Sequence, residues 1–381
     1  MTMTAAAAPR GLKGLIVADT ALGDVRGLEG FYHYRQYSAP DLAAARTFED
    51  VWYLLFEGEL PSTSARAAYA AHIARARPLP LAVPELLPAF ASGLTPPLAA
   101  LRTALSHLAA IEGMPPTYEA VPETIRTNAL RMAAVTPVLV AALYRAGRGA
   151  PIVAPRDDLG HVANYLYMID GEVPDPRRVR AVEQYMILAI DHGFNSSTFT
   201  ARVVTSTGAD VGAAVVAALG ALSGPLHGGA PSRALDTLDA IGTPDNTEAW
   251  VRSAVASGQR IMGFGHAVYR TADPRSVMLR AIAREFGGPR VDFAVQVEAT
   301  VERVLAELKP GRELHTNVEY YAGVVMELCG IPRELFTSTF AASRMVGWCA
   351  QILEQSSDTA IIRPSARYIG PDAPEPVPAA I

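Results

Sequence analysis

Apolar residues along the chain recur mostly at steps of three and four, which is the spacing of one face of an α-helix. One such series consists of Val179, Val182, Met186 and Ile190. The start signal Pro174-Asp175-Pro176 precedes this series and Gly193 follows it, so a helix is expected between them. We expect Ser196 or Ser197 to cap the next helix, which leaves His192 at the C-terminal end of the first.

The remaining pattern also predicts an all-α fold. A second amphipathic series, which ends before Pro310-Gly311, consists of Val301, Val304, Leu305 and Leu308. The longest apolar stretches, 132–144 and 211–222, are shorter than the roughly 20 residues that span a bilayer, so both are predicted to be buried helices. Strand-like sequence is limited to 15–17 and 31–34. Two proline-rich segments are expected to be a connection between helices, 78–97, and a disordered tail, 370–381.

The composition is that of a soluble globular protein with more than one domain. The chain has 381 residues, half of them apolar, and a net charge of −5. Its 33 basic residues form no run and are outnumbered by 38 acidic ones, so nucleic acid is not an expected partner. It has only two cysteines, Cys329 and Cys349, and such a low number is typical of proteins in a reducing compartment. Residues 1–9 lack a secretion signal. We therefore expect a cytoplasmic protein with no membrane segment.

Two histidines set among glycines mark the candidate active site. His227 lies within the glycine-containing segment 224–229, and His266 ends the segment 262–266. Because glycine has no Cβ, a ligand can lie directly against the main chain beside each imidazole. Taken singly, such a histidine is more often part of a turn, and a single arginine more often forms a surface ion pair. The histidines and carboxylates lack the spacing of metal ligands, and no nucleotide-binding glycine motif occurs.

Taken together, in their order and spacing, these motifs resemble the citrate synthase family. The matching segments are 14–60 with Tyr34-Arg35, 164–168 running into 174–176, Asp191-His192, 195–202, the two histidine loops, Asp273-Pro274-Arg275, 317–321, Ile331-Pro332, Ser343-Arg344, Gly347-Trp348 and Arg363-Pro364. The resemblance covers nearly the whole chain, thins between residues 61 and 155, and ends after residue 370.

The resemblance implies a helical homodimer and a carbon–carbon bond-forming reaction. The large domain would consist of residues 1–226 and 327–369, and an inserted small domain, about 227–326, would close over the site and exclude water. Members of the family condense acetyl-CoA with oxaloacetate and hydrolyse the citryl-CoA intermediate. Acyl-CoA and oxaloacetate would therefore be substrates, and no cofactor or metal is expected.

Residue roles follow from the same resemblance. Glu319 would remove a methyl proton from the thioester, while His227 donates to the thioester oxygen and His266 to the oxaloacetate ketone. Guanidinium groups suit the two carboxylates of oxaloacetate because they are permanently charged and bidentate. The expected oxaloacetate ligands are His192, Arg275, Arg344 and, reaching across the dimer, Arg363. The expected CoA contacts are Leu226, Ile261, Met262, Gly263, Phe264, Gly265, Arg270 and Asn317.

Four positions depart from the family pattern. Glu319 stands where most members have aspartate, and its extra methylene can displace the carboxylate by roughly 1 Å, which costs on the order of 100-fold in rate when geometry is strict. A divergent branch of the family carries glutamate here, which favours a repacked site. Gly193, Pro231 and Ala267 replace a common glutamate, asparagine and arginine, so the shape of the pocket stays open.

Three functions remain compatible with the sequence. The first is a citrate synthase, or a 2-methylcitrate synthase that uses propionyl-CoA. The second is a relative that cleaves citryl-CoA or joins another acyl-CoA to a 2-oxo acid. The third is a non-catalytic paralogue that binds CoA or citrate. Three histidines and three arginines in matching motifs argue against the third, because each buried polar group without a ligand carries a desolvation cost.

Overall fold

The computed structural model describes residues 8–92, 95–228, 230–266, 268–371, 374, 376 and 377, and of residues 230–232 it describes the backbone alone. Some features discussed above fall outside this part of the chain. They are Gly229, Ala267, the side chain of Pro231, and residues 372, 373, 375 and 378–381 of the tail that we expect to be disordered.

The fold is all-α, with one small sheet. In the described residues the helices are α1 (Ala39–Ala45), α2 (Phe48–Glu57), α3 (Thr63–Arg75), α4 (Ala82–Phe90), α5 (Pro97–Ile111), α6 (Pro122–Ala146), α7 (His161–Asp170), α8 (Pro176–Ala189), α9 (Ser196–Ser206), α10 (Val211–Leu222), α11 (Ala230–Ile241), α12 (Thr247–Ala256), α13 (Pro274–Phe286), α14 (Pro289–Leu308), α15 (Val318–Leu328) and α16 (Phe336–Ser356). Short 3₁₀ turns are η1 (Arg10–Leu12), η2 (Pro244–Asn246) and η3 (Arg333–Leu335). The antiparallel sheet has the order β1 (Gly23–Arg26), β2 (Phe31–Tyr34) and β3 (Tyr37–Ser38).

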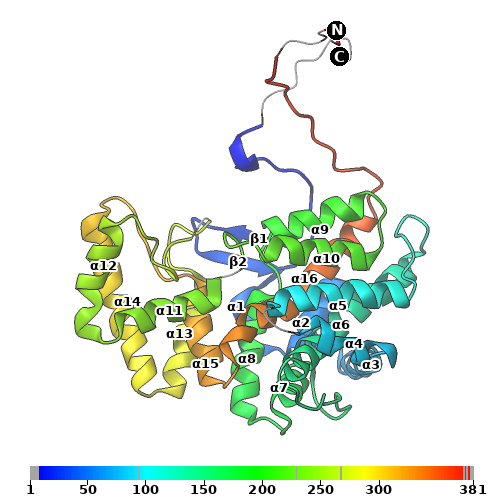
Figure 1. Ribbon diagram of the computed structural model, residues 1–381, viewed down its shortest axis with the longest axis horizontal. Helices are drawn as coiled ribbons and strands as arrows, with labels where there is room; N and C mark the ends of the chain where they lie inside the picture. The colour runs from blue at the N-terminus through cyan, green and yellow to red at the C-terminus, as the bar shows by residue number, and fades with distance from the viewer. Residues whose placement is uncertain are drawn as a thin grey trace.

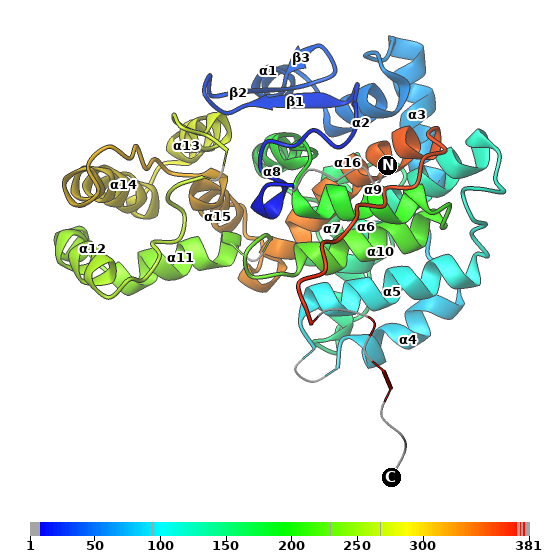
Figure 2. The ribbon, with the colours of Figure 1, turned by 90° about the horizontal axis from the view of Figure 1, so that it is seen from above.

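The helices form two groups with a shared middle. In Figures 1 and 2, α11 to α14 lie at one side and α3 to α7 with α9 and α10 at the other, while α8 and α15 lie between them. The larger group is built around α16, which packs against α6, α9 and α8 and is buried along most of its length. The hairpin of β1 and β2 covers one end of α8. The domain boundaries at 227 and 326 stay a prediction.

Four helices around the candidate site begin at side-chain caps. Each of α8, α9, α13 and α15 follows an Asp or Asn whose side chain accepts a backbone N–H two or three residues ahead. These caps are Asp175, Asn195, Asp273 and Asn317. Because a cap fixes where a helix begins, it also fixes the direction of the first-turn side chains. Ser197, Arg275 and Glu319 all lie in such first turns.

Several expected elements are confirmed. The two amphipathic series form α8 and α14, and the two long apolar stretches form part of α6 and all of α10. The segment 31–34 is strand β2. Among the described residues, one helix, α6, is long and apolar enough to cross a membrane by length and composition, but 78% of its most apolar window is buried inside the protein.

Other expectations were wrong. Helix α8 ends at Ala189, so His192 lies beyond it, and the cap of α9 is Asn195 rather than a serine. The segment 15–17 has no regular secondary structure. Strands β1 and β3 were missed because each is formed by pairing with β2. The proline-rich segment 78–97 contains α4, in which Pro84 lies in the first turn where its missing N–H costs nothing.

Candidate active site

His227 lies in the turn after α10 and faces the first turn of α9. Its backbone N–H donates to Gly224 O at 2.9 Å, and the Gly228 N–H donates to Leu222 O at 3.0 Å. A Cβ on Gly228 would lie 2.6 Å from the Leu222 side chain, so the turn requires glycine at this point. The turn directs the imidazole to Ser197, whose hydroxyl oxygen lies 2.8 Å from Nε2.

The first turn of α9 determines which ring nitrogen of His227 carries the proton. The Ser197 amide donates to Nε2 at 3.3 Å, and a backbone N–H can only donate. The Ser197 hydroxyl has one hydrogen and lies 2.8 Å from Nε2 and 2.7 Å from Asn195 Oδ1, so it can donate to Nε2 as well, and the Trp348 indole N–H donates to the hydroxyl oxygen at 3.2 Å. Burial, reinforced by the charge of Arg344, lowers the pKa of His227 to about 4, so the ring is neutral. We therefore assign its proton to Nδ1.

His266 is oriented by its own loop. The amides of Val268 and Tyr269 both donate to its Nδ1, each at 3.1 Å. Burial, with the charge of Arg275 next, lowers its pKa to about 4, so the single ring proton lies on Nε2. The Arg275 Nη2, which is also a donor, lies 3.2 Å from this nitrogen. Two donors this close require a common acceptor, which indicates a binding position for an oxygen atom of a ligand.

His192 completes a cluster of aromatic rings around this position. Its Nε2 lies 2.9 Å from the hydroxyl oxygen of Tyr269. The His192 ring centroid is 5.8 Å from that of His266 and 5.3 Å from that of Tyr32. Burial, and then the charges of Arg275 and Arg344, hold the pKa of His192 well below its ordinary value. All three predicted histidines are therefore neutral near pH 7. A neutral imidazole can still donate a hydrogen bond, and it does not repel the nearby arginines.

Arg275 is buried and held by one carboxylate. Its Nε and Nη2 donate to Asp273 at 2.9 and 2.7 Å, and its backbone N–H donates to the same carboxylate at 3.0 Å. Although burial opposes the charge, Asp273 raises the pKa of Arg275 above its ordinary value. Asp273 Oδ2 also accepts the Val318 N–H at 3.1 Å, at the start of α15. One carboxylate thus connects Arg275 to the helix that carries Glu319.

Arg344 comes from α16 and is 2% exposed. Its Nε donates to Ala189 O at 2.8 Å, at the end of α8, and its guanidinium lies 4.8 Å from the Phe340 ring centroid. Within the described residues, no hydrogen bond occupies its two terminal nitrogens. A second buried guanidinium with free donors beside Arg275 is suited to a ligand that carries two negative charges.

Glu319 lies in the first turn of α15, with its backbone N–H bonded to Asn317 Oδ1 at 3.1 Å. In the part of the chain that the structure describes, its carboxylate accepts no hydrogen bond and forms no ion pair. Burial raises its pKa to about 7, opposed by the charge of Arg275 and raised further by Asp273. A carboxyl group with a pKa near the ambient pH is suited to general base catalysis.

The second glycine-rich segment pairs with the strand-like residues that precede α15. Phe264 forms a bridge with Thr316, and the Gly265 N–H donates to His315 O at 2.8 Å. Asn317 donates through its backbone to Gly263 O and through its side chain to Gly265 O, both at 2.9 Å. This pairing holds the segment beside Glu319, so it places the predicted CoA contacts 261–265 and Asn317 next to the predicted base.

Among the described residues, no hydrogen bond or ion pair joins the side chains of three predicted site residues to this cluster. Leu226 is 88% exposed, and the Arg270 side chain is exposed while its backbone N–H donates to Gly27 O. Arg363 is exposed in the extended segment after α16. That segment is held by the Ile362 N–H, which donates to Ser206 Oγ at 3.0 Å at the far end of α9.

Sequence reasoning missed the roles of Ser197 and Tyr269. Ser197 was expected to serve as a cap, but its hydroxyl and amide hold His227 instead. Asparagine and serine are about equally favourable N-caps, so the sequence did not distinguish Asn195 from the two serines as the cap of α9. Tyr269 carried no local signal, because its contact with His192 depends on tertiary structure.

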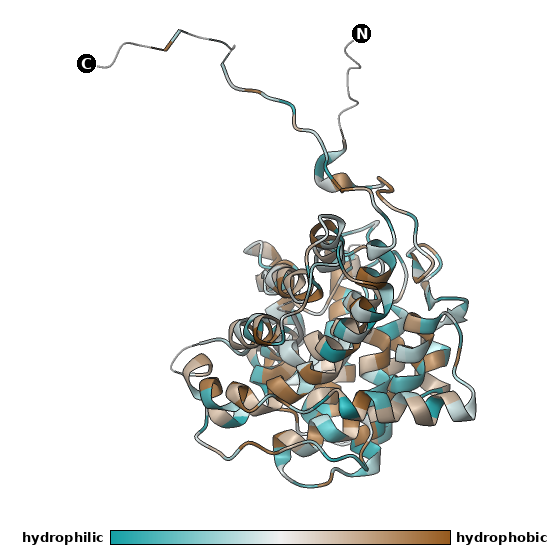
Figure 3. Cartoon of the chain, turned by 90° about the vertical axis from the view of Figure 1, so that its right-hand side faces the viewer, coloured by the Kyte–Doolittle hydropathy of each residue, from teal (hydrophilic) through white to brown (hydrophobic). Residues whose placement is uncertain are grey.

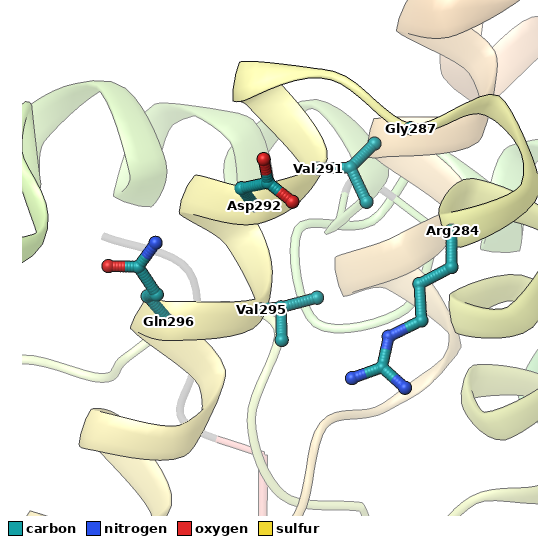
Figure 4. Close-up of a pocket in the computed structure, with 6 residues that line it drawn as sticks. All are labelled: Arg284, Gly287, Val291, Asp292, Val295 and Gln296. Atoms are coloured by element: carbon teal, nitrogen blue, oxygen red, sulfur yellow. The ribbon is translucent and has the colours of Figure 1, made fainter.

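A separate pocket lies away from the predicted site residues. A pocket of about 330 Å³ between the end of α13 and the start of α14 is lined by Arg284, Gly287, Val291, Asp292, Val295 and Gln296 (Figure 4). It contains none of the predicted site residues. Across the described residues, no three His, Cys, Asp or Glu side chains are grouped as metal ligands.

Comparisons with known proteins identify the family of this chain. The family described as "Citrate synthase, C-terminal domain" matches residues 11–365. The chain is 36% identical to the citrate synthase of Deinococcus radiodurans over 362 residues, which is 95% of each chain. It is 39% identical to a 2-methylcitrate synthase of Mycobacterium tuberculosis, over 95% of this chain and 90% of that protein.

A solved structure gives the same result for the fold. The citrate synthase of Thermoplasma acidophilum, in a ternary complex with carboxymethyl coenzyme A and oxaloacetate, matches with a TM-score of 0.89 and 28% identity. The match covers 97% of this chain and 98% of that one. The extent of these matches and the arrangement of the three histidines lead to one conclusion: this chain belongs to the citrate synthase family of acyltransferases.

Proposed function

We propose that the protein condenses acetyl-CoA with oxaloacetate and hydrolyses the resulting citryl-CoA to citrate and CoA. The observation that carries this proposal is the neutral state of two histidines, His227 and His266, together with the raised pKa of Glu319. Backbone amides occupy Nε2 of His227 and Nδ1 of His266, so each neutral ring presents its one N–H to a ligand. A pair of such donors with a carboxylate of raised pKa is what enolate chemistry requires.

The reaction uses these groups in sequence. Glu319 takes a proton from the methyl carbon of acetyl-CoA while the Nδ1–H of His227 stabilises the charge that develops on the thioester oxygen. The enolate carbon then attacks the ketone carbon of oxaloacetate, and the Nε2–H of His266 protonates the alkoxide. Water finally cleaves the thioester and releases CoA. In this last step the hydroxide of water bonds to the thioester carbon and its proton goes to the CoA sulfur, while the proton held by Glu319 replaces the one that His266 has donated.

Oxaloacetate would lie between α13, α16 and the loop of His192. The support is the close approach of Arg275 Nη2 to His266 Nε2 and the free terminal nitrogens of Arg344. The pantetheine arm of CoA would follow the segment 261–265, with Leu226, Arg270 and Asn317 beside it. Acyl-CoA and oxaloacetate serve as substrates in this proposal, and no further cofactor takes part.

We infer a cytoplasmic homodimer in which Arg363 serves the site of the partner. Ser206, which holds the segment of Arg363, lies nine residues along α9 from Ser197, or roughly 14 Å. That distance exceeds the reach of an arginine toward its own site. Both terminal segments leave the same end of the helical body (Figure 3) and expose large apolar side chains. These include Ile16, Ile361, Tyr368 and Ile369, which a second subunit would cover.

The proposal is tested by the release of CoA thiol from acetyl-CoA and from propionyl-CoA, each with and without oxaloacetate. We expect release from acetyl-CoA only when oxaloacetate is present. Propionyl-CoA is expected to react as well, because one methylene changes binding by only about 1–3 kcal/mol. Equal release without oxaloacetate would identify a thioesterase, and no release with either thioester would favour a non-catalytic paralogue. A strong preference for propionyl-CoA would favour 2-methylcitrate synthase.

The pH dependence of the reaction provides a second test. The pKa of Glu319 is raised to about 7, so the fraction in the basic form increases as the pH rises through 7. We expect kcat/KM for acetyl-CoA to rise about tenfold per pH unit below 7 and to level off near pH 8. His227 and His266, each with a pKa of about 4, are neutral throughout this range. A flat profile between pH 5.5 and 8.5 would contradict the role of Glu319.

A further inference from the structure

The hairpin turn between β1 and β2, residues 27–30, lies directly against the loop that follows His266. The Arg270 N–H donates to Gly27 O at 3.0 Å. A Cβ added to Gly27 would lie 2.8 Å from the Val268 carbonyl carbon and 2.9 Å from its Cγ1, closer than real Cβ atoms approach. A Cβ added to Gly30 would lie 2.7 Å from the Thr271 hydroxyl oxygen. The two glycines therefore allow a contact that no other residue permits.

The loop in contact with this turn is the one that orients His266. The amides of Val268 and Tyr269 are the two donors to His266 Nδ1. A displacement of Val268 would move the first of these donors directly. The turn and the imidazole thus lie on opposite sides of the same short stretch of backbone.

The other end of the hairpin is fixed to the loop of His192. The Tyr32 hydroxyl donates to Leu188 O at 3.1 Å in the last turn of α8. The Tyr34 hydroxyl lies 2.9 Å from Ile187 O in the same turn and 3.1 Å from Asp191 O, the residue before His192. A Cβ on Gly193, next to His192, would lie 3.3 Å from Val25 of β1. The hairpin therefore connects the loop that carries His192 to the loop that carries His266.

We propose that this hairpin is a positioning element for oxaloacetate, which sets the distance between the His192 loop and the His266 loop through the contact of residues 27–30 with residues 268–272. The proposal rests on the proposed function for the identity of the ligand. Its physical basis is that the hairpin bonds to both loops while its own residues 27–30 lie outside the imidazole cluster. Gly27 and Gly30 are thus positioning residues that act through the backbone around His266.

The first experiment replaces Gly27 by alanine. Gly220 of α10 provides the matched control, because a Cβ there would meet no atom within 4 Å. We expect Gly27→Ala to raise the KM for oxaloacetate by about tenfold or more, with the dissociation constant of CoA unchanged within about twofold. Hydrogen exchange at the amides of Val268 and Tyr269 should accelerate in the ligand-free protein. Gly220→Ala should change none of these quantities.

The second experiment separates positioning from strain. Gly30 has a φ of +62°, so Gly30→Ala is strained and also meets Thr271. Adding Thr271→Ala removes the contact but not the strain. We expect the double variant to recover most of the oxaloacetate affinity while its melting temperature stays as low as that of Gly30→Ala. A double variant as impaired in oxaloacetate binding as the single one would overturn the proposal.

The two proposals fail in different ways. If the wild-type protein neither binds nor consumes oxaloacetate, the proposed function is wrong, yet amide exchange at residues 268 and 269 still reports the effect of Gly27→Ala. If the wild type uses oxaloacetate but Gly27→Ala leaves its KM within twofold and leaves exchange unchanged, the hairpin is not a positioning element.

Discussion

Replacement of Glu319 by glutamine is expected to lower kcat by about 10²–10⁴-fold, which is the usual contribution of a general base. Glutamine keeps the length of the side chain but cannot accept the methyl proton. The dissociation constant of oxaloacetate should stay close to that of the wild type, because Glu319 acts on the other substrate. The measurement is steady-state thiol release together with calorimetric titration of oxaloacetate. Unchanged turnover would remove Glu319 from the mechanism.

The aspartate variant at the same position shows whether the site is built for glutamate. Glu319→Asp retains the charge but withdraws the carboxylate by one methylene, a displacement of roughly 1 Å that can cost on the order of 100-fold. We expect the rate to fall, although less than with glutamine. A marked rate increase would instead show that the site retains the geometry that suits aspartate, and that glutamate is a defect in this chain.

Mixed dimers are expected to recover activity that neither parent variant has. Arg363→Ala and Glu319→Gln should each be nearly inactive as homodimers. In a mixed dimer, the intact Glu319 of one chain meets the intact Arg363 of the other, which gives one complete site and one site with both lesions. Purified heterodimers should therefore show up to about half of the wild-type activity. The measurement is thiol release after separation of the heterodimer with two different affinity tags.

This experiment has an internal control. Mixed dimers of Glu319→Gln with Arg344→Ala should stay inactive if Arg344, which is buried within its own chain, serves the site of that chain. Every site in such a dimer carries one lesion. If the Arg363 pair also fails to recover, Arg363 serves its own chain and the shared site is refuted.

The sequence predicted the all-α fold, but it did not predict which contacts orient the candidate site residues. Long apolar series such as the one in α8 have a clear period, and prolines at helix starts mark their first residue. The motifs around His227, His266 and Arg275 were recognisable because glycine and proline leave few local conformations. The structure brings His192, His266 and Arg275 together, and burial with nearby arginines sets their charge states.

The contacts that orient these groups depend on residues far apart in the chain. Ser197 and His227 are 30 residues apart, and Tyr32 meets His192 across 160 residues, so no local pattern contains either contact. The strand β1 was missed for the same reason, since its alternation of half-buried and exposed residues is meaningful only beside β2. Helix α4 was missed because two prolines outweighed its apolar face.

The shared carboxylate of Asp273 has a consequence for how this enzyme can change over evolutionary time. It holds α15 through the backbone amide of Val318, so this contact does not depend on which side chain occupies position 319. The helix start keeps its place relative to Arg275 whichever acid occupies position 319. A lineage can thus exchange aspartate for glutamate at position 319 while the contacts of Arg275 stay in place, and adjust the surrounding pocket afterwards.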